Sequence, residues 1–144
     1  SEVTIPYSIM RIGVVLGEQG ALPLLKWVYK SFLGGHLGSG NQGFPWIHIN
    51  DVVGLIEYEM KQKESKRIVH VVGPEIVTAK EFGKTIASVL KKPNLMRAPS
   101  FLIDLLGGEM ASLVTKTPKV ARTLDDTYNF QYPTCEGALK EILL

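Results

Sequence analysis

The first feature of this chain that could do chemistry is a set of glycines spaced like a dinucleotide-binding loop. Gly38, Gly40 and Gly43 fit the pattern G-x-G-x-x-G, which binds a pyrophosphate only where a strand ends and a helix begins. Here the glycines precede residues 44–49 (FPWIHI), a strand-like run that contains a proline. We therefore favour a loop whose glycines supply backbone freedom.

Polar residues in and after this loop are the next candidates for a site. Ser39 and Gln42 are the better candidates for substrate contacts, because polar groups on surface loops often carry function. His48 could be a general acid or base, since imidazole titrates near neutrality. The sequence offers it no second catalytic partner, so a structural histidine is favoured. Trp46 is expected to pack, and Asp51 is expected to cap a helix.

The remaining reactive side chains predict no further site. His36, His48 and His70 are isolated and Cys135 is remote from them, so we expect no metal. As the one cysteine, Cys135 cannot form an internal disulfide, and a half-buried helical position is expected for it. Glu109 is interpreted as a carboxylate stabilised by a helix N-terminus.

The composition excludes several classes of protein. The chain has 144 residues, a length typical of one domain, and a formal net charge of +2. Acidic and basic residues are interspersed, which predicts no binding to nucleic acid. We expect no membrane insertion, since no apolar run approaches the roughly 20 residues of a span, and no signal peptide. A soluble protein is expected. Its compartment stays open, and a reducing one, the cytoplasm or the organelle matrix of a eukaryote, fits the sequence.

Two apolar runs predict the strands that position these residues. Residues 5–16 and 68–72 are rich in β-branched side chains with little alternation, as in strands buried on both faces of a parallel sheet. Three helices alternate with them, which indicates an α/β fold. They are residues 21–33 with Pro23 in the first turn and Gly34 at the end, 52–60 after Asp51, and 82–90 after the capping box Thr78-x-x-Glu81.

The C-terminal residues predict shorter elements. We expect helices at 101–106, 109–114 and 119–125, an edge strand at 128–132, and a last helix capped by Thr134. Two long buried strands cannot form a self-sufficient sheet, because both faces need cover. The chain therefore has the pattern of half a fold, and a fragment or a processed chain is expected.

Several motifs together resemble a known family. They are residues 11–17 (RIGVVLG), 34–42 (GGHLGSGNQ), 45–51 (PWIHIND), 74–82, 99–101, 108–111 and 130–133. Their order and spacing resemble the extended short-chain dehydrogenase/reductases, and more narrowly the YfcH-type epimerase family proteins related to nucleoside-diphosphate-sugar epimerases. The resemblance covers essentially the whole chain.

The resemblance implies an α/β fold in two parts. Residues 1–92 would be the C-terminal part of a Rossmann-like doubly wound parallel sheet, together with the loop of a small, mostly helical substrate lobe. Residues 93–144 would be the family-specific C-terminal extension.

The resemblance also implies what the chain lacks. The family's glycine-rich turn and catalytic Tyr-x-x-x-Lys have no counterpart here. The nearest substitute, Tyr7-x-x-x-Arg11, lies in a buried-strand pattern, and arginine cannot replace the tunable lysine amine. NADP or NAD is expected in the full-length protein, with none bound by this chain alone. Near the nicotinamide, contacts are expected from Arg11, Gly13, Val14 and Val15, although sheet packing is the favoured role of these valines.

The resemblance leaves three functions open. The first is the substrate-lobe half of an NAD(P)-dependent epimerase-like oxidoreductase, inactive alone. Its substrate contacts would include Ser39, Gln42, Trp46 and His48. The expected partner is then the N-terminal Rossmann half. The alternatives are a non-catalytic subunit that keeps the fold as a packing module against another protein chain, and a standalone binding domain. Phe44 replaces an arginine that binds diphosphate in related enzymes, which argues against a nucleotide-sugar substrate.

Overall fold

One long extended segment, residues 8–16, runs through the molecule and changes its partner halfway. The computed structural model describes residues 7–35, 39–62, 67–94 and 128–144. Strand β1 (Ser8–Ile12) pairs in parallel with β5 (Arg67–Val71), whereas β2 (Val14–Leu16) pairs in parallel with β4 (Trp46–His48). The prediction of a single strand over residues 5–16 is therefore wrong, because the structure has two strands there with different partners.

The change of partner occurs at Gly13. Its N–H donates to the carbonyl of Val71 at 3.0 Å, and the next N–H, of Val14, donates to Pro45 at 2.6 Å. A Cβ at Gly13 would clash with the Pro45 carbonyl oxygen and press on Val72. Glycine is needed here because two neighbouring strands approach the same backbone position.

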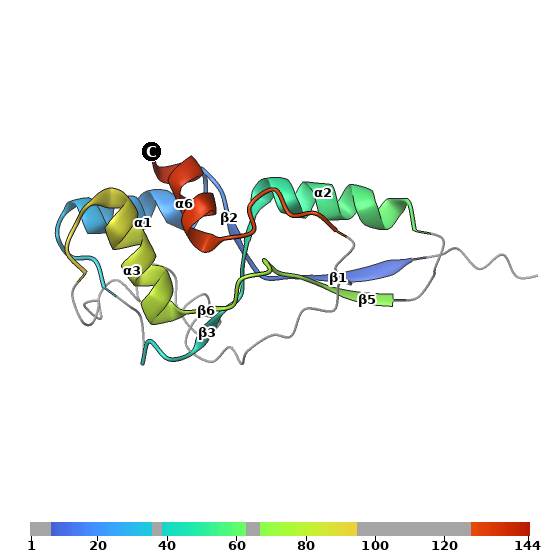
Figure 1. The fold of residues 1–144 in the computed structure, drawn as a ribbon, viewed down its shortest axis with the longest axis horizontal. Coiled ribbons are helices and arrows are strands. Elements are labelled where there is room, and N and C mark those ends of the chain that lie inside the picture. Colours follow the sequence, from blue (N-terminus) through green and yellow to red (C-terminus); the bar gives the residue numbers. More distant parts are fainter. Residues whose placement is uncertain (1–6, 36–38, 63–66, 95–127) are drawn as a thin grey trace, which may run out of the picture.

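Helix α2 (Ile49–Met60) covers one face of the β1–β5 ladder (Figure 1). Its apolar stripe joins the inward side chains of the strands in a core of Ile47, Val52, Leu55, Val69 and Val71. On the opposite face, Ile9 and Ile68, adjacent in register, are 49% and 47% exposed. The expectation that both faces of this ladder are buried is thus wrong, because α2 covers one face and none of the other described helices covers the second.

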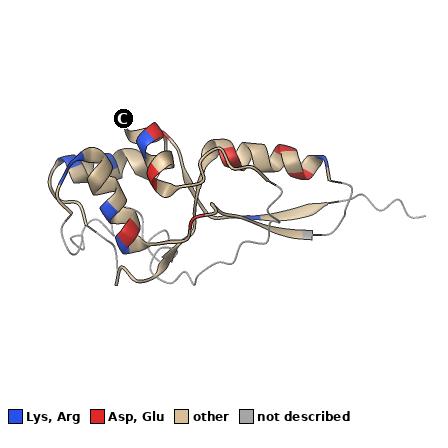
Figure 2. Cartoon of the chain, in the orientation of Figure 1, with Lys and Arg blue, Asp and Glu red and all other residues tan. Residues whose placement is uncertain are grey.

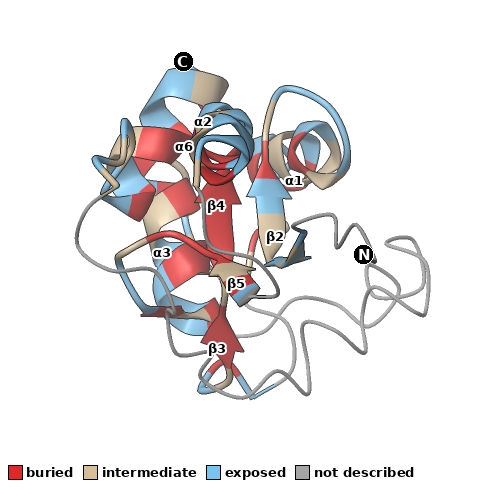
Figure 3. Cartoon of the chain, turned by 90° about the vertical axis from the view of Figure 1, so that its right-hand side faces the viewer, coloured by how far each residue is buried: buried red, intermediate tan, exposed pale blue. Residues whose placement is uncertain are grey.

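The second and larger core lies at the other end of the molecule. It is formed by α1 (Ala21–Lys30), α3 (Ala79–Leu90), α6 (Cys135–Leu143) and the antiparallel pair β3 (Gly43–Phe44) and β6 (Val77–Thr78). Its buried side chains include Tyr29, Trp46, Phe82, Ile86 and Leu139. These elements enclose β4, whose three residues are all buried (Figure 3). Helices α3 and α6 carry charged residues of both signs, whereas the charged residues of α1 are lysines (Figure 2).

The predicted caps are confirmed for two helices and wrong for a third. Thr78 and Glu81 form the complete capping box of α3, and the Thr134 hydroxyl caps α6. Helix α2, however, begins at Ile49, and its N-cap is His48 rather than Asp51.

Helix α1 is shorter than predicted. It ends at Lys30, with Phe32 in a left-handed conformation at φ 63° and exposed. Gly34 packs directly on the ring of Tyr29, which leaves no room for a side chain.

The predicted edge strand at 128–132 is wrong, since this segment is irregular. Its alternation is real, because Tyr128, Phe130 and Tyr132 are half-buried. Its N–H groups at Gln131 and Tyr132 bind the Asp51 carboxylate instead of another strand. The helices predicted between residues 101 and 125, with Glu109, lie outside the described residues.

Candidate functional site

The predicted nicotinamide contacts lie along the extended segment 8–16 but differ in exposure. Arg11 is exposed on β1, Gly13 lies at the change of partner, and Val14 is half-buried against the larger core. Val15 is 40% exposed. Tyr7, four residues before Arg11, is also exposed rather than buried as its pattern suggested. The exposed side chains of this segment are apolar or cationic, and they form no acid–base pair.

The pyrophosphate of a dinucleotide needs free N–H groups at a helix N-terminus, and those of α3 are occupied. The N–H of Ala79 donates to the Gln42 carbonyl at 3.0 Å, and that of Lys80 to Gly40 at 2.9 Å. The N–H of Glu81 donates to the Thr78 hydroxyl at 3.2 Å. Carbonyl groups of the glycine-rich loop thus occupy the first N–H groups of α3. Gly43 begins a strand, not a helix.

The other described helices fit a pyrophosphate no better. Helix α2 is capped by His48, and α6 by Thr134, while the first N–H of α6, from Cys135, donates to Glu75 at 2.5 Å. Helix α1 starts without a side-chain cap, but Pro23 removes an N–H from its first turn. The N-termini of α2, α3 and α6 are therefore occupied and do not fit the phosphate end of NAD(P).

The substrate-lobe candidates Ser39 and Gln42 lie together. The Ser39 hydroxyl donates to Gln42 Oε1 at 2.9 Å, and it accepts from the N–H of Asn41 at 3.3 Å. The Ser39 side chain is exposed, whereas the main chain of this loop is fixed to α3. Gly40, at φ 77°, allows the turn. The Ser39 hydroxyl and the Gln42 amide therefore lie side by side on a loop whose backbone is hydrogen-bonded to α3.

Trp46 has a packing position. It is 1% exposed, and its indole N–H donates to the carbonyl of Glu75 at 3.0 Å. Gly73 contacts the ring so closely that a side chain there would press on it. Trp46 therefore lies beneath the surface, as expected from the sequence, and joins β4 to the segment that follows β5.

Both ring nitrogens of His48 are engaged. Nδ1 accepts from the N–H of Asn50 at 3.1 Å, so the proton of the neutral ring lies on Nε2. Nε2 donates to the Glu141 carboxylate at 3.2 Å, and the ring packs on Tyr132 with centroids 3.8 Å apart. With 2% of its surface exposed, His48 ties the start of α2 to α6. This favours the structural interpretation made from the sequence.

Asp51 is the residue whose role the sequence did not reveal. Its carboxylate is fully buried and accepts from the N–H groups of Gln131 and Tyr132 at 2.7 and 3.0 Å. The Tyr128 hydroxyl lies 3.5 Å away, and burial and then Asp51 raise the pKa of that phenol. The donors lie some 80 residues along the chain, so no local pattern could have paired them with Asp51. Within the residues that the structure describes, Asp51 is the anchor of this C-terminal segment.

Two further titratable groups, the Tyr29 phenol and the Cys135 thiol, are buried in the core. Burial raises the pKa of the Tyr29 phenol, whose hydroxyl donates to Gly35 at 3.3 Å. Burial and then Glu75 raise the pKa of Cys135 to about 12. Among the described residues no three potential ligands gather to hold a metal. No helix in that part of the chain is long and apolar enough to span a membrane.

Known proteins resemble this chain over nearly its full length. Residues 98–142 match a family described as a domain of unknown function, DUF1731. The epimerase family protein YfhF of Bacillus subtilis (strain 168) is 36% identical over 135 residues, covering 92% of this chain and 45% of YfhF. A crystal structure of the human epimerase family protein SDR39U1 (isoform 2) with NADPH is 32% identical, with a TM-score of 0.82. It covers 94% of this chain and 48% of that one.

A more distant likeness supports the fold alone. The UDP-glucose 4-epimerase of Thermotoga maritima is 14% identical with a TM-score of 0.67, covering 96% of this chain and 45% of that enzyme. With the human structure it confirms the predicted α/β class, the C-terminal part of a Rossmann-like sheet. The chain spans about half the length of the curated relatives that it matches.

Proposed function

Because this chain corresponds to a C-terminal part of the epimerase family proteins, we propose that it is the substrate-lobe half of an NAD(P)-dependent epimerase-like oxidoreductase. One observation carries the proposal. The human relative was solved with NADPH, whereas the capped N-termini of α2, α3 and α6 do not fit a pyrophosphate. The phosphate end of the cofactor then belongs to the N-terminal half, and this chain alone is inactive.

The contribution of this chain is to line the site. Val14, Val15 and Arg11 approach the nicotinamide end, and the Ser39–Gln42 pair offers hydrogen bonds to the substrate. Phe44 is buried and stacks on Phe82 with ring centroids 4.0 Å apart. Phe44 offers no guanidinium to a diphosphate, which argues against a nucleoside-diphosphate-sugar substrate.

The division at residues 92 and 93 remains part of the proposal. The described end of the extension packs onto the first part: α6 contacts α3 and β2, and residues 128–132 contact α2. The extension would then hold the substrate lobe against the sheet.

An NADPH titration followed by nucleotide fluorescence tests the proposal. The 144-residue chain is compared with a joined protein in which the N-terminal part of Bacillus subtilis YfhF, left out of the match, precedes it. The joined protein should bind NADPH and the chain alone should not. Stoichiometric binding by the isolated chain would contradict the proposal.

A packing module is the second candidate, because half-exposed apolar residues lie on both α2 and the β1–β5 ladder. A module without a catalytic role has no need of a cofactor site. The same titration separates the two functions: a folded joined protein that fails to bind NADPH favours the module.

A further inference from the structure

Two large aromatic side chains are exposed at one end of the molecule, where α1 and α3 lie side by side (Figure 1). Trp27 lies in the last turn of α1 and is 56% exposed, and Phe32 follows this helix and is 57% exposed. The Phe32 ring reaches the end of α3, because Lys92 Nζ lies 4.3 Å from the ring centroid. Exposed rings thus occur where the two helices end.

Three lysines accompany these rings. Lys30 is the last residue of α1, and Lys91 and Lys92 directly follow α3. Figure 2 shows blue where the two helices end, and no acidic residue occurs in residues 25–35 or 87–94. The surface formed by Trp27, Lys30, Phe32, Lys91 and Lys92, which we call the α1–α3 end, is therefore both aromatic and basic.

The carboxylates of α6, the helix that packs on α3, have partners of their own. Glu136 pairs with Lys140 at 2.7 Å, and Glu141 accepts from the His48 ring at 3.2 Å. Glu81 lies at the opposite end of α3, in the capping box. Among the described residues, none of these three carboxylates neutralises the lysines of the α1–α3 end.

Both helices are followed by a residue in a position that glycine would normally occupy. Phe32 has φ 63° and Lys91 has φ 52°, the left-handed conformation in which a side chain costs free energy. The turn itself needs only the backbone, so glycine would serve in both places. The chain instead keeps an aromatic ring and an ammonium group there, and strained residues of this kind gather at sites that bind.

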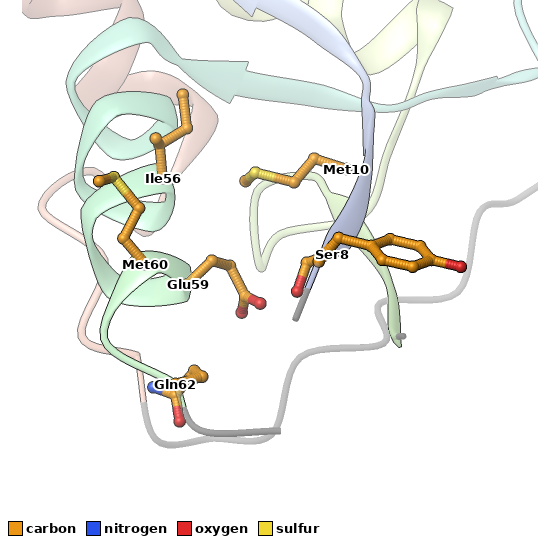
Figure 4. Close-up of a pocket in the computed structure, with 7 residues that line it drawn as sticks. Ser8, Met10, Ile56, Glu59, Met60 and Gln62 are labelled. Carbon is orange, nitrogen blue, oxygen red and sulfur yellow. The ribbon is translucent and has the colours of Figure 1, made fainter. Parts of the chain in front are cut away.

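The surface at the other end of the molecule has a different character. There a cleft of about 240 Å³ lies between β1 and α2, and its lining includes Met10, Ile56, Glu59 and Met60 (Figure 4). None of the described residues that line this cleft is a lysine or an arginine. The apolar surface in the cleft is thus combined with a carboxylate, whereas that of the α1–α3 end is combined with lysines.

We propose that the α1–α3 end binds the surface of an anionic phospholipid membrane. Aromatic rings favour the level of the lipid headgroups, and lysines are attracted to phosphatidylserine while their stems lie along apolar surface. Size argues against a protein partner: Trp27 and Phe32 together expose on the order of 250 Å², well below the roughly 800 Å² per partner of a stable protein interface. The contact is peripheral, since no described helix is long and apolar enough to span a bilayer.

Tryptophan fluorescence during titration with vesicles tests the inference on the 144-residue chain and on the joined protein. The emission of Trp27 should move to shorter wavelength with vesicles of phosphatidylcholine and phosphatidylserine, and not with phosphatidylcholine alone. Added salt should reverse the change. Lys91→Glu should weaken binding at least about fivefold, the factor expected for one lysine near an anionic surface. Phe32→Gly should weaken it without lowering the melting temperature, because glycine favours φ 63°.

Lys61→Glu is the matched control, because Lys61 is also an exposed lysine at a helix C-cap, on α2 at the other end of the molecule. It should leave vesicle binding unchanged, and circular dichroism checks the fold of each variant. Equal binding of the folded proteins to both kinds of vesicle, or to neither, would overturn the inference. So would equal losses in Lys61→Glu and Lys91→Glu, and so would binding to polyglutamate or single-stranded DNA without binding to vesicles.

Discussion

Replacing Asp51 by asparagine removes the charge that holds the C-terminal segment. In Asp51→Asn one oxygen remains to accept from Gln131, while the amide NH₂ faces the N–H of Tyr132. Two donors then oppose each other at a position with no exposed surface. We expect residues 128–132 to detach from α2 and the protein to lose stability.

The loss can be bounded from the two hydrogen bonds. Each bond to a charged group contributes about 1.5–3 kcal/mol. Gln131 is exposed and Tyr132 half-exposed, so water replaces part of what they lose. We therefore expect the free energy of unfolding to fall by about 2 kcal/mol, or roughly 30-fold in the equilibrium constant.

Urea unfolding followed by tryptophan fluorescence measures this loss, because buried Trp46 changes environment while exposed Trp27 changes little. Glu57→Gln is the control, since Glu57 is an exposed carboxylate on the same helix. It should change stability by less than about 0.5 kcal/mol. If Asp51→Asn and Glu57→Gln were equally stable, the anchoring role of Asp51 would be refuted.

Three further predictions concern the fold. Gly13→Ala should cost about 2–3 kcal/mol because its methyl meets the Pro45 carbonyl, whereas Gly17→Ala, with its nearest neighbour at 3.5 Å, should be tolerated in the same urea experiment. Thr78→Ala should cost about 1 kcal/mol by removing the α3 cap, and equal thermal melting of the two proteins would contradict this. Cys135, with its pKa raised to about 12, should resist a thiol reagent at pH 8 until the protein unfolds. Fast labelling of the native protein would contradict this protection. Because an unfolded thiol has a pKa near 9.0, burial of Cys135 should stabilise the fold fully below pH 9 and progressively less between pH 9 and 12.

Local chemistry made the described helices and two of their caps predictable. The Thr78–Glu81 box and the Thr134 cap depend on residues three positions apart, so the sequence alone locates them. Apolar spacing likewise predicted α1, α2, α3 and α6 to within a few residues at their ends.

Contacts between distant residues were not predictable. The change of strand partner at Gly13 depends on Pro45 and Val71, and nothing near residue 13 encodes it. Asp51 had the sequence position of an N-cap, but His48 takes that role and Asp51 binds N–H groups some 80 residues away. The alternation at residues 128–132 predicted correctly which side chains are half-buried. It wrongly predicted hydrogen bonds to a neighbouring strand, because the Asp51 carboxylate accepts from the N–H groups of residues 131 and 132.

Amide hydrogen exchange tests the central claim, that this chain is one half of a divided sheet, most directly. It compares the 144-residue chain with the joined protein carrying the YfhF N-terminal part. The account predicts that amides of Ser8–Ile12 exchange far more slowly in the joined protein. The reason is that one edge of β1, which pairs with none of the described strands, gains a hydrogen-bonded neighbour. Unchanged exchange at Ser8–Ile12 in a folded joined protein would contradict it.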